Sequence, residues 1–583
     1  MTSLRTFQNE IDEISHRKRA VDPSSTAQSP PDPSKVDEDE VPDIDEQVQD
    51  LLLSGKAENR DRARDVLASV LTRGRGEYIF RIGSFPPHAS LFAYEPITAN
   101  DAHGTPRTAQ ELCSLHEGIT NIVDEVGGKV SVLYESTVAP LRIALLLRLP
   151  PPSVALTPEV RCAVVGNVDS GKSTTLGVLT RGALDDGRGR ARVSLFRHKH
   201  EVESGRTSSV GMEILGFGPT GKPILPPTSH STELEVIRRE KMSWEDISIQ
   251  ASKIISFIDL AGHERYLKTT LYGLTSGAPS CVILIVGGNA GLIGMSKEHL
   301  AIALALSVPV VVCITKIDMT PRPKLEETIK QVTKILKSPG CRKTPIFVKS
   351  EETSVEVSQV FAKDRLCPIF QLSNVTGEGL DYLRTFLNLL PASEGDTEKF
   401  LVDQPLEYCV TEVWSVPYVG TVVDGILNAG RVKAGDAVMI GPDSNGNFQN
   451  TVIKSIQRKR AEAGQCVSFA LKRMRRAAVR KGMVIVHKTE TPPRAVRRFE
   501  GQVLILYHNT TLQRNYQAML HCGAIRQTVR IVAMDHPQGV LRTGDRATVT
   551  FEFISHPEYI KEGMKLLFRE GKTKGLGVIT KLL

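Results

Sequence analysis

The sequence is poor in cysteine, and its few cysteines form no pattern. Nine are scattered singly among 583 residues, and no two form a C-x-x-C pair. Several, such as Cys162, Cys281 and Cys313, lie inside apolar runs typical of buried strands, where a thiol acts as a small apolar side chain. The sequence therefore indicates neither a disulfide framework nor a zinc site.

Long apolar runs and a large excess of charge are also missing. No stretch reaches the roughly 18 uninterrupted apolar residues that a membrane-spanning helix needs, and residues 1–20 lack the apolar core of a signal peptide. We therefore expect a cytoplasmic protein without a membrane partner. The formal net charge of +7 does not by itself imply a nucleic-acid partner, and no DNA partner is expected.

What the sequence does contain is a phosphate-binding pattern. The letters GNVDSGKS at 166–173 match G-x-x-x-x-G-K-[ST], and they directly follow an apolar run typical of a buried strand. In such a loop, backbone N–H groups surround phosphate oxygens, the lysine neutralises the outer phosphates and the serine offers a hydroxyl to magnesium. A chance glycine loop is the alternative, but the strand before and the helix-compatible TTLGVLTR after it supply the expected context. The predicted triphosphate-binding residues are Asn167, Val168, Asp169, Ser170, Gly171, Lys172, Ser173 and Thr174.

A second polar cluster follows the apolar run in KIISFIDLAGHE. Asp259 ends this run, and an aspartate at a strand end can hold magnesium through water. The backbone N–H of Gly262 could donate to the terminal phosphate. An aspartate at a strand end is also commonly a helix cap, so this cluster alone does not establish a magnesium site.

Two later clusters point to guanine. Thr315, Lys316 and Asp318 follow the apolar run 308–314, where a carboxylate can accept the two N–H donors on the edge of guanine and a lysine stem can cover the ring. Adenine offers no such pair of donors. Ser373 and Asn374 follow another apolar run and would present backbone N–H groups to the base oxygen. Ligands gather at the carboxyl edge of a doubly wound sheet, so the ordered set predicts a GTPase domain at 156–392, with a mostly parallel sheet in an α/β fold.

The same residues carry a resemblance to a known family. GNVDSGKST is similar to the GHVDHGKST signature of translational GTPases related to elongation factor Tu, DLAGHE to their DxPGH and TKID to their NKxD. Longer stretches, such as FIDLAGHERYLKTT, SFALKRMRRAAVRKGM and YQAMLHCGAIRQT, resemble the family of GTP-binding proteins 1 and 2. This resemblance runs from about residue 75 to the C-terminus.

The resemblance implies roles for two further residues. Thr207 would be the switch threonine that joins Ser173 on Mg²⁺ when the γ-phosphate of GTP is present, with Asp259 holding the ion through water. His263 would position the water that converts GTP to GDP and phosphate, and the ribosome would be the activator. A surface histidine that caps the following helix is the alternative for His263.

Three departures from the family pattern affect this expectation. Thr315 replaces the usual asparagine of NKxD, which removes an amide that braces the loop. Asn167 and Ser170 replace two histidines of GHVDHGK. Arg206 replaces an isoleucine, so a hydrophobic gate formed with Val168 around His263 would lack one half.

The rest of the chain divides into four further segments. Residues 1–45 form an acidic, Pro- and Ser-rich tail that we expect to be disordered. Alternating helix and strand patterns at 46–153 predict a small α/β domain. Short β segments separated by turn residues predict two β-barrels, at 398–490 and 494–583. The Pro- and Gly-rich stretch 217–235 predicts a mobile loop inserted beside the first switch segment.

Basic residues in the first predicted barrel suggest an RNA partner. Clusters of this kind neutralise phosphates and release counterions, although a solvated face is the alternative. Tyr507 and Tyr516 could stack on bases or belong to the barrel core. By resemblance, the RNA would be aminoacyl-tRNA docked on the second barrel, together with ribosomal RNA. The predicted RNA-binding residues are Arg458, Lys459, Arg460, Lys472, Arg473, Arg475 and Arg476.

Two functions remain open from the sequence. One is a magnesium-dependent GTPase that binds aminoacyl-tRNA or the ribosome in its GTP form and releases them in its GDP form. The other is an adaptor for RNA surveillance or decay machinery, in which GTP is a structural ligand and little is hydrolysed. The complete set of predicted site residues favours the first, whereas Arg206 and Thr315 leave room for the second.

Overall fold

The structure is a computed structural model that describes most of the chain. The described residues are 43–95, 102–136, 140–154, 157–196, 201, 203, 207–208, 210–226, 242–362, 365–391, 402–456, 460–489, 493–571 and 573–583. The tail expected to be disordered lies outside these residues up to position 42, and so do Arg206, Arg458 and Lys459. Among helices in the described ranges, none is long and apolar enough to cross a bilayer.

The N-terminal α/β domain is a three-stranded antiparallel sheet covered by helices. Its strand order is β1-β3-β2, and Leu67, Phe80, Ile119 and Leu145 lie in its buried core. The alternation of helix and strand predicted for this segment is present. The elements are α2 (Ile44–Leu53), α3 (Ala57–Arg73), β1 (Glu77–Gly83), α4 (His88–Ala93), α5 (Ala109–Glu125), β2 (Lys129–Ser136) and β3 (Arg142–Arg148).

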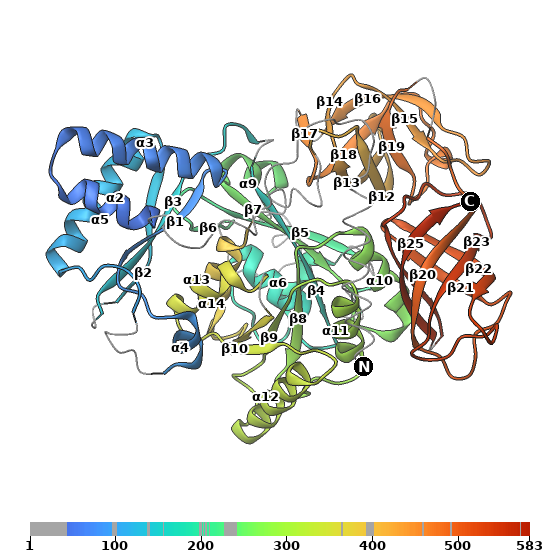
Figure 1. The fold of residues 1–583 in the computed structure, drawn as a ribbon, viewed down its shortest axis with the longest axis horizontal. Helices are drawn as coiled ribbons and strands as arrows, with labels where there is room; N and C mark the ends of the chain where they lie inside the picture. Colours follow the sequence, from blue (N-terminus) through green and yellow to red (C-terminus); the bar gives the residue numbers. More distant parts are fainter. Residues whose placement is uncertain are drawn as a thin grey trace.

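An eight-stranded sheet forms the centre of the molecule (Figure 1). The strand order is β10-β11-β9-β8-β4-β7-β5-β6; the strands from β10 to β7 are parallel, and β5 and β6 extend this edge antiparallel. This mixed but mostly parallel sheet confirms the predicted fold class. Its strands are β4 (Glu159–Gly166), β5 (Gly211–Phe217), β6 (Pro223–Ile224), β7 (Lys253–Asp259), β8 (Cys281–Gly287), β9 (Val310–Thr315), β10 (Thr344–Phe347) and β11 (Leu366–Gln371).

Helices cover both faces of this sheet. Along β8, Ile283 packs toward the core that contains α6 and α14, whereas Leu284 packs toward the core that contains α10, α11 and α12. Strands buried on both faces read as continuous apolar runs, which is why the sequence revealed them. The helices of this domain are α6 (Lys172–Arg181), α9 (Trp244–Gln250), α10 (Leu267–Ser276), α11 (Met295–Ala305), α12 (Arg322–Lys337), α13 (Glu351–Val360) and α14 (Leu380–Leu389), with 3-10 helices η3 (Arg190–Leu195) and η4 (Glu264–Tyr266).

The stretch that was predicted as a mobile loop is partly a hairpin. β5 runs to Phe217, the chain turns, and β6 pairs antiparallel with the end of β5 through Pro223 and Ile224. Residues 227–241 lie outside the described part of the chain, so the expectation of mobility is not tested there. The short helix α9 follows this stretch, and Trp244 packs against the cluster of Ile214, Ile247 and Ile254.

Two closed β-barrels follow the central domain, as predicted. The first has the strand order β12-β13-β18-β16-β15-β19, and the second has the order β20-β23-β22-β21-β24-β25. A two-stranded pair, β14 with β17, lies beside the first barrel. The strands are β12 (Glu407–Val416), β13 (Gly420–Ala429), β14 (Arg431–Lys433), β15 (Ala437–Gly441), β16 (Gln449–Ile456), β17 (Arg460–Glu462), β18 (Cys466–Leu471), β19 (Val484–His487), β20 (Arg498–Tyr507), β21 (Gln517–Cys522), β22 (Ile525–Asp535), β23 (Arg546–Phe553), β24 (Lys565–Glu570) and β25 (Thr573–Leu582).

The N-terminal domain and the barrels lie at opposite ends of the central domain (Figure 1). At one end, Arg81 and His88 of the N-terminal domain contact Glu356 of α13. At the other, Leu567 and Leu576 of the second barrel join the core beneath α10 and α11. The central domain therefore contacts the N-terminal domain at one end and the second barrel at the other.

Candidate functional site

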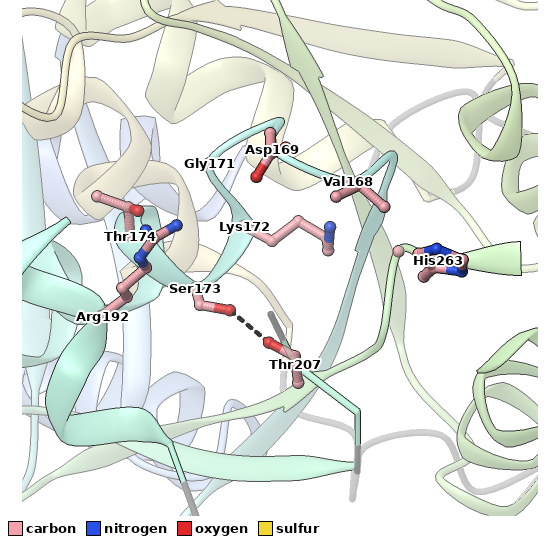
Figure 2. A pocket seen from close by; sticks show the side chains of 10 residues that line it. Val168, Asp169, Gly171, Lys172, Ser173, Thr174, Arg192, Thr207 and His263 are labelled. Carbon is pink, nitrogen blue, oxygen red and sulfur yellow. Dashed lines mark hydrogen bonds between the residues drawn. The ribbon is translucent and has the colours of Figure 1, made fainter. Parts of the chain in front are cut away.

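The loop between β4 and α6 forms one wall of an open cavity (Figure 2). The ammonium of Lys172 and the hydroxyl of Ser170 both donate to the carbonyl of Asn167, at 2.6 and 2.9 Å, which closes the loop on itself. From α11, the Ser296 hydroxyl accepts the N–H of Asn167, at 3.0 Å. The predicted residues Val168, Asp169, Gly171, Lys172, Ser173 and Thr174 line the cavity.

Lys172 is buried at the base of this loop. Burial lowers the pKa of its ammonium to about 8, although the charges of Asp259 and Asp169 act in the opposite direction. A phosphate beside the ammonium would favour its charged form, because opposite charges at short range stabilise each other. An anionic ligand in the cavity would therefore stabilise the charged form of Lys172.

The segment after β7 lies so close to Lys172 that only glycine fits. A Cβ at Gly262 would lie 2.4 Å from the lysine Nζ and 2.7 Å from the carbonyl oxygen of Gly166. A Cβ does not approach non-bonded nitrogen or oxygen atoms so closely, so a larger residue would displace the phosphate-binding loop. Gly262 lines the cavity. This position agrees with the prediction that its N–H donates to the terminal phosphate.

Three oxygen-bearing side chains from distant segments meet at the cavity. The Ser173 hydroxyl donates to Asp259 Oδ2 at 2.7 Å. It also lies 2.9 Å from the hydroxyl of Thr207, as the dashed line in Figure 2 shows. Asp259 Oδ1 is buried and has no hydrogen-bond partner among the described residues. Burial raises the pKa of this carboxyl to about 6, against the hydrogen bond from Ser173 and the charge of Lys172. Hydroxyl and carboxylate oxygens are the ligands that Mg²⁺ prefers, so the set fits this ion.

His263 lines the same cavity but uses its ring elsewhere. Its Nδ1 accepts the N–H of Arg265 at 3.1 Å, so the side chain caps η4, and the ring packs edge-on against Tyr266. Figure 2 shows the ring pointing away from Lys172. This is the capping arrangement that was the alternative for His263. To position a water molecule in the cavity, the His263 side chain would have to rotate.

The residues predicted to bind guanine lie next to the phosphate-binding loop. Thr315 ends β9, and its hydroxyl donates to the carbonyl of Ser170 at 2.6 Å. The amide of the usual asparagine is absent, as the sequence indicated, but a hydroxyl on the buried strand end contacts the loop directly and braces it. Asn374 donates to the hydroxyl of Thr175 in α6 at 3.0 Å, and the N–H of Ile317 points to the carbonyl of Leu372 at 3.5 Å.

The other three residues predicted to bind guanine differ in their surroundings. Asp318 is exposed beyond the end of β9, where its carboxylate is accessible to a ligand. Ser373 is fully buried, and its hydroxyl accepts the N–H groups of Val375 and Thr376. The serine thus shapes the turn that carries Asn374. Lys316 directly follows β9. Its φ is 62°, a left-handed conformation that is uncommon for lysine.

Two contributors to this site were not predicted from the sequence. Arg192, on η3, lines the cavity beside the phosphate-binding loop. His299, on α11, is buried and accepts the N–H of Gly166 at Nδ1, at 3.2 Å, and burial lowers its pKa to about 3. Neither residue belongs to a recognisable motif. A lone arginine in a polar segment and a lone histidine on an apolar helix give no signal in sequence.

The predicted RNA-binding residues of the first barrel have different surroundings. Lys472, Arg473 and Arg475 are exposed between β18 and the short helix η6 (Arg476–Ala478). The guanidinium of Arg476 donates to the carbonyls of Val413 and Val479, so part of its donor set holds the barrel together. Arg460 begins β17, and its side chain is not described.

Aromatic residues that were not predicted from the sequence lie near the basic segment, residues 472–475. Tyr418, in the turn between β12 and β13, is fully exposed, and Trp414 of β12 is 44% exposed. The Thr421 hydroxyl of β13 donates to the carbonyl of Met474, which joins this hairpin to the basic segment. Of the two tyrosines proposed earlier, Tyr507 is 44% exposed, whereas Tyr516 packs against the core of the second barrel.

Comparisons with known proteins agree with this architecture. Residues 157–408 match the elongation factor Tu GTP-binding domain, and residues 492–583 match the elongation factor Tu C-terminal domain. The chain is 46% identical to GTP-binding protein 1 of Xenopus laevis over 548 residues, which cover 93% of this chain and 79% of that protein. It is 43% identical to human GTP-binding protein 2 over 523 residues, which cover 88% and 82%.

A solved structure shares the fold at low identity. A bacterial selenocysteine-specific elongation factor superposes with a TM-score of 0.50 at 19% identity, over 72% of this chain and 58% of that one. This likeness concerns the fold alone. On the sequence identity to its relatives and on its two elongation factor Tu domains, the chain belongs to the family of GTP-binding proteins 1 and 2, within the translational GTPases.

Proposed function

We propose that this protein binds GTP with Mg²⁺ at the described cavity and hydrolyses it to GDP and phosphate. The observation that carries the proposal is the meeting of Ser173, Thr207 and Asp259 beside Lys172. These residues come from a phosphate-binding loop, a segment before β5 and the end of β7. Their convergence supports a cation and phosphate site that the γ-phosphate can order.

Each residue has a defined task in this proposal. The loop residues 167–174 hold the phosphates through backbone N–H groups, and Lys172 neutralises their charge. Ser173 and Thr207 would hold Mg²⁺ directly and Asp259 through water; when bound, the ion neutralises charge that develops on the phosphate oxygens. The N–H of Gly262 would donate to the terminal phosphate.

In this proposal the base lies beside the phosphate-binding loop, at the ends of β9 and β11. Asp318 accepts the N–H donors on the edge of guanine, and the stem of Lys316 covers the ring. Thr315 and Asn374 support this end through their contacts with Ser170 and Thr175, and the turn shaped by Ser373 presents N–H groups to the base oxygen. The proposal therefore assigns guanine specificity chiefly to Asp318.

His263 is the proposed catalytic residue. Its ring would leave the N–H of Arg265 and turn into the cavity, where it would orient the attacking water. Hydrolysis of this kind depends on positioning and charge neutralisation. Because the ring caps η4 in this structure, we expect hydrolysis to be slow until a partner stabilises the turned ring.

The proposed partners of the GTP form are aminoacyl-tRNA and the ribosome, in the cytoplasm. Exposed Lys472, Arg473 and Arg475 beside exposed Trp414 and Tyr418 combine phosphate-neutralising and base-stacking groups. Such a combination suits RNA better than an acidic protein surface, because aromatic rings stack on bases.

An adaptor that binds GTP and hydrolyses little is the second candidate. The observation that favours it is the engagement of His263 Nδ1 by Arg265. In this alternative the protein would recruit RNA surveillance or decay machinery, and the nucleotide would stabilise its RNA-binding form.

Single-turnover hydrolysis of GTP, with and without ribosomes, separates the two candidates. We expect ribosomes to stimulate hydrolysis strongly, and His263→Ala to abolish the stimulation while GTP still binds. Measured binding of a fluorescent GTP analogue shows that the variant retains its site. Stimulated hydrolysis that is equal in variant and parent would remove His263 from the mechanism, and hydrolysis that ribosomes do not change would favour the adaptor.

A further inference from the structure

A loop between α6 and the switch segment brings an arginine to the phosphate cavity. Arg192 lies on η3 and lines the same cavity as Lys172, Ser173 and Thr174. Figure 2 shows its guanidinium on the side of Thr174, with Lys172 and His263 on the other side of the view. The two cationic side chains thus approach different parts of one site.

The guanidinium of Arg192 has no acidic partner in the described part of the chain. It is half-buried, and neither an ion pair nor a hydrogen bond of its side chain is found among the described residues. Withdrawing a cation from water without a counter-charge costs free energy. An anion in the cavity would offset this cost, and a phosphate matches the planar fork of arginine.

Asp185 holds the loop that carries this arginine. Its buried carboxylate accepts the N–H groups of Gly187, Gly189 and Ala191, at 3.0, 3.1 and 2.9 Å. The N–H of Asp185 donates to the carbonyl of Asn374 at 2.8 Å. These hydrogen bonds fix the loop and tie it to the segment proposed to bind the base.

Close packing against α6 fixes the position of η3. A Cβ at Gly177 of α6 would lie 2.1 Å from the carbonyl oxygen of Ala191, so backbone packs on backbone at this point. The side chain of Arg192 folds back over Gly189, where a Cβ would lie 2.5 Å from its Nε. Arg192 is thus held beside the first turn of α6 by neighbours that leave little space for other arrangements.

We propose that Arg192 is a nucleotide-binding residue that contacts the α-phosphate of the bound nucleotide. In a loop of this pattern, the lysine reaches the outer phosphates, whereas backbone groups cradle the inner ones. Arg192 lies on the side of Thr174 and not on that of Lys172, which places it at the inner end. GTP and GDP share the α-phosphate, so the arginine strengthens binding of both.

This inference rests on the proposed nucleotide site, and its test separates the two. Dissociation constants for GDP and for a non-hydrolysable GTP analogue are measured with parent, Arg192→Ala and Arg192→Lys. We expect Arg192→Ala to weaken both nucleotides about tenfold, the loss of one charge-assisted hydrogen bond. Arg192→Lys should lose less, because it keeps the charge without the fork.

Arg188→Ala is the matched control, since Arg188 is exposed on the same loop and does not line the cavity. It should bind both nucleotides as the parent does. Equal affinities for Arg192→Ala and parent would overturn the inference, and so would a loss confined to the GTP analogue, which would place the guanidinium at the γ-phosphate. A parent that binds neither nucleotide would instead contradict the proposed function. Unfolding temperatures without nucleotide verify that the variants are folded.

Discussion

At the scale of single residues, the site combines groups that are costly to bury. Asp259 illustrates this, because one of its carboxylate oxygens has no partner among the described residues and its pKa is raised to about 6. Lys172 is buried as well, and burial lowers its pKa to about 8. Such groups destabilise an empty site and are compensated when a ligand of opposite charge binds.

This cost predicts opposite effects of Asp259→Asn on stability and binding. Without nucleotide at pH 7.5, the variant should be about 1–2 kcal/mol more stable, since a neutral amide replaces a buried charge. Magnesium-dependent binding of GTP should be strongly weakened. Urea unfolding and nucleotide titration with and without Mg²⁺ measure the two effects.

Asp381, which is exposed and pairs with the half-buried Arg384, supplies a control for this comparison. Asp381→Asn should leave nucleotide binding unchanged and alter stability by less than about 1 kcal/mol. If Asp259→Asn binds GTP and magnesium as the parent does, Asp259 is not part of the cation site.

Asp318 gives a second prediction at this scale, on the identity of the base. Asp318→Asn replaces an acceptor by a side chain that also donates, so preference should shift from GTP toward xanthosine triphosphate. Competition between the two nucleotides for a fluorescent analogue measures the shift. An unchanged order of affinities would mean that another residue reads the base.

At the scale of secondary-structure elements, sequence predicted those that are buried on both faces or alternate regularly. The apolar runs at 162–165 and 308–314 became β4 and β9, and the polar residues after them lie together at one edge of the sheet. Elements with weak patterns were missed, among them α4, β6, β14 and β17. They are short, and contacts made by distant segments determine them.

Long-range contacts also explain what the sequence could not reveal about the site. The role of Thr315 depends on a carbonyl 145 positions earlier in the chain. The position of Arg192 depends on Asp185 and on the close approach of η3 to α6 at Gly177. No local pattern encodes either arrangement, because each side chain could equally face solvent.

Helix α13 provides a prediction at this scale. Burial alone would raise the pKa of Glu356, but the hydrogen bond from His88 and the charge of Arg81 outweigh it and hold the pKa at about 2. The pKa lies below its ordinary 4.5, so the ionised carboxylate stabilises the fold above about pH 4.5, and this contribution is lost as the pH falls through about 2.

Glu356→Gln should therefore destabilise the protein by about 3 kcal/mol at pH 7. The difference from the parent should shrink below pH 4.5, because the carboxyl of the unfolded parent becomes protonated there while that of the folded parent stays ionised down to about pH 2. Urea unfolding at pH 7 and at pH 3.5 measures both values. A difference that does not depend on pH would show that packing, and not charge, accounts for the contribution of Glu356.

At the scale of the whole molecule, α11 connects the phosphate-binding loop to the second barrel. Ser296 and His299 accept N–H groups of Asn167 and Gly166, and Glu298 between them pairs with Arg569 and Lys574 of the barrel. A change of the loop with nucleotide would thus reach the barrel through one helix. The first barrel contacts α10 instead, where the Tyr272 hydroxyl donates to the carbonyl of Thr411.

The last prediction concerns the surface by which the barrels would bind RNA. Charge reversal of exposed Arg473 and Arg475 should weaken binding of unfractionated tRNA to the GTP form, because two phosphate contacts are lost. The slope of log K against log salt should become shallower by about 1.5. Arg476 is left unchanged, since its bonds to Val413 and Val479 would confound binding with stability.

The matched control reverses Arg62 and Arg73, which are exposed on α3 at the opposite end of the molecule (Figure 1). It changes the net charge by the same amount, so any effect of overall charge appears in both variants. We expect the control to keep the salt slope of the parent. Equal slopes for all three proteins would mean that the basic segment of the first barrel is a solvated face, and the RNA-binding surface would then have to lie elsewhere.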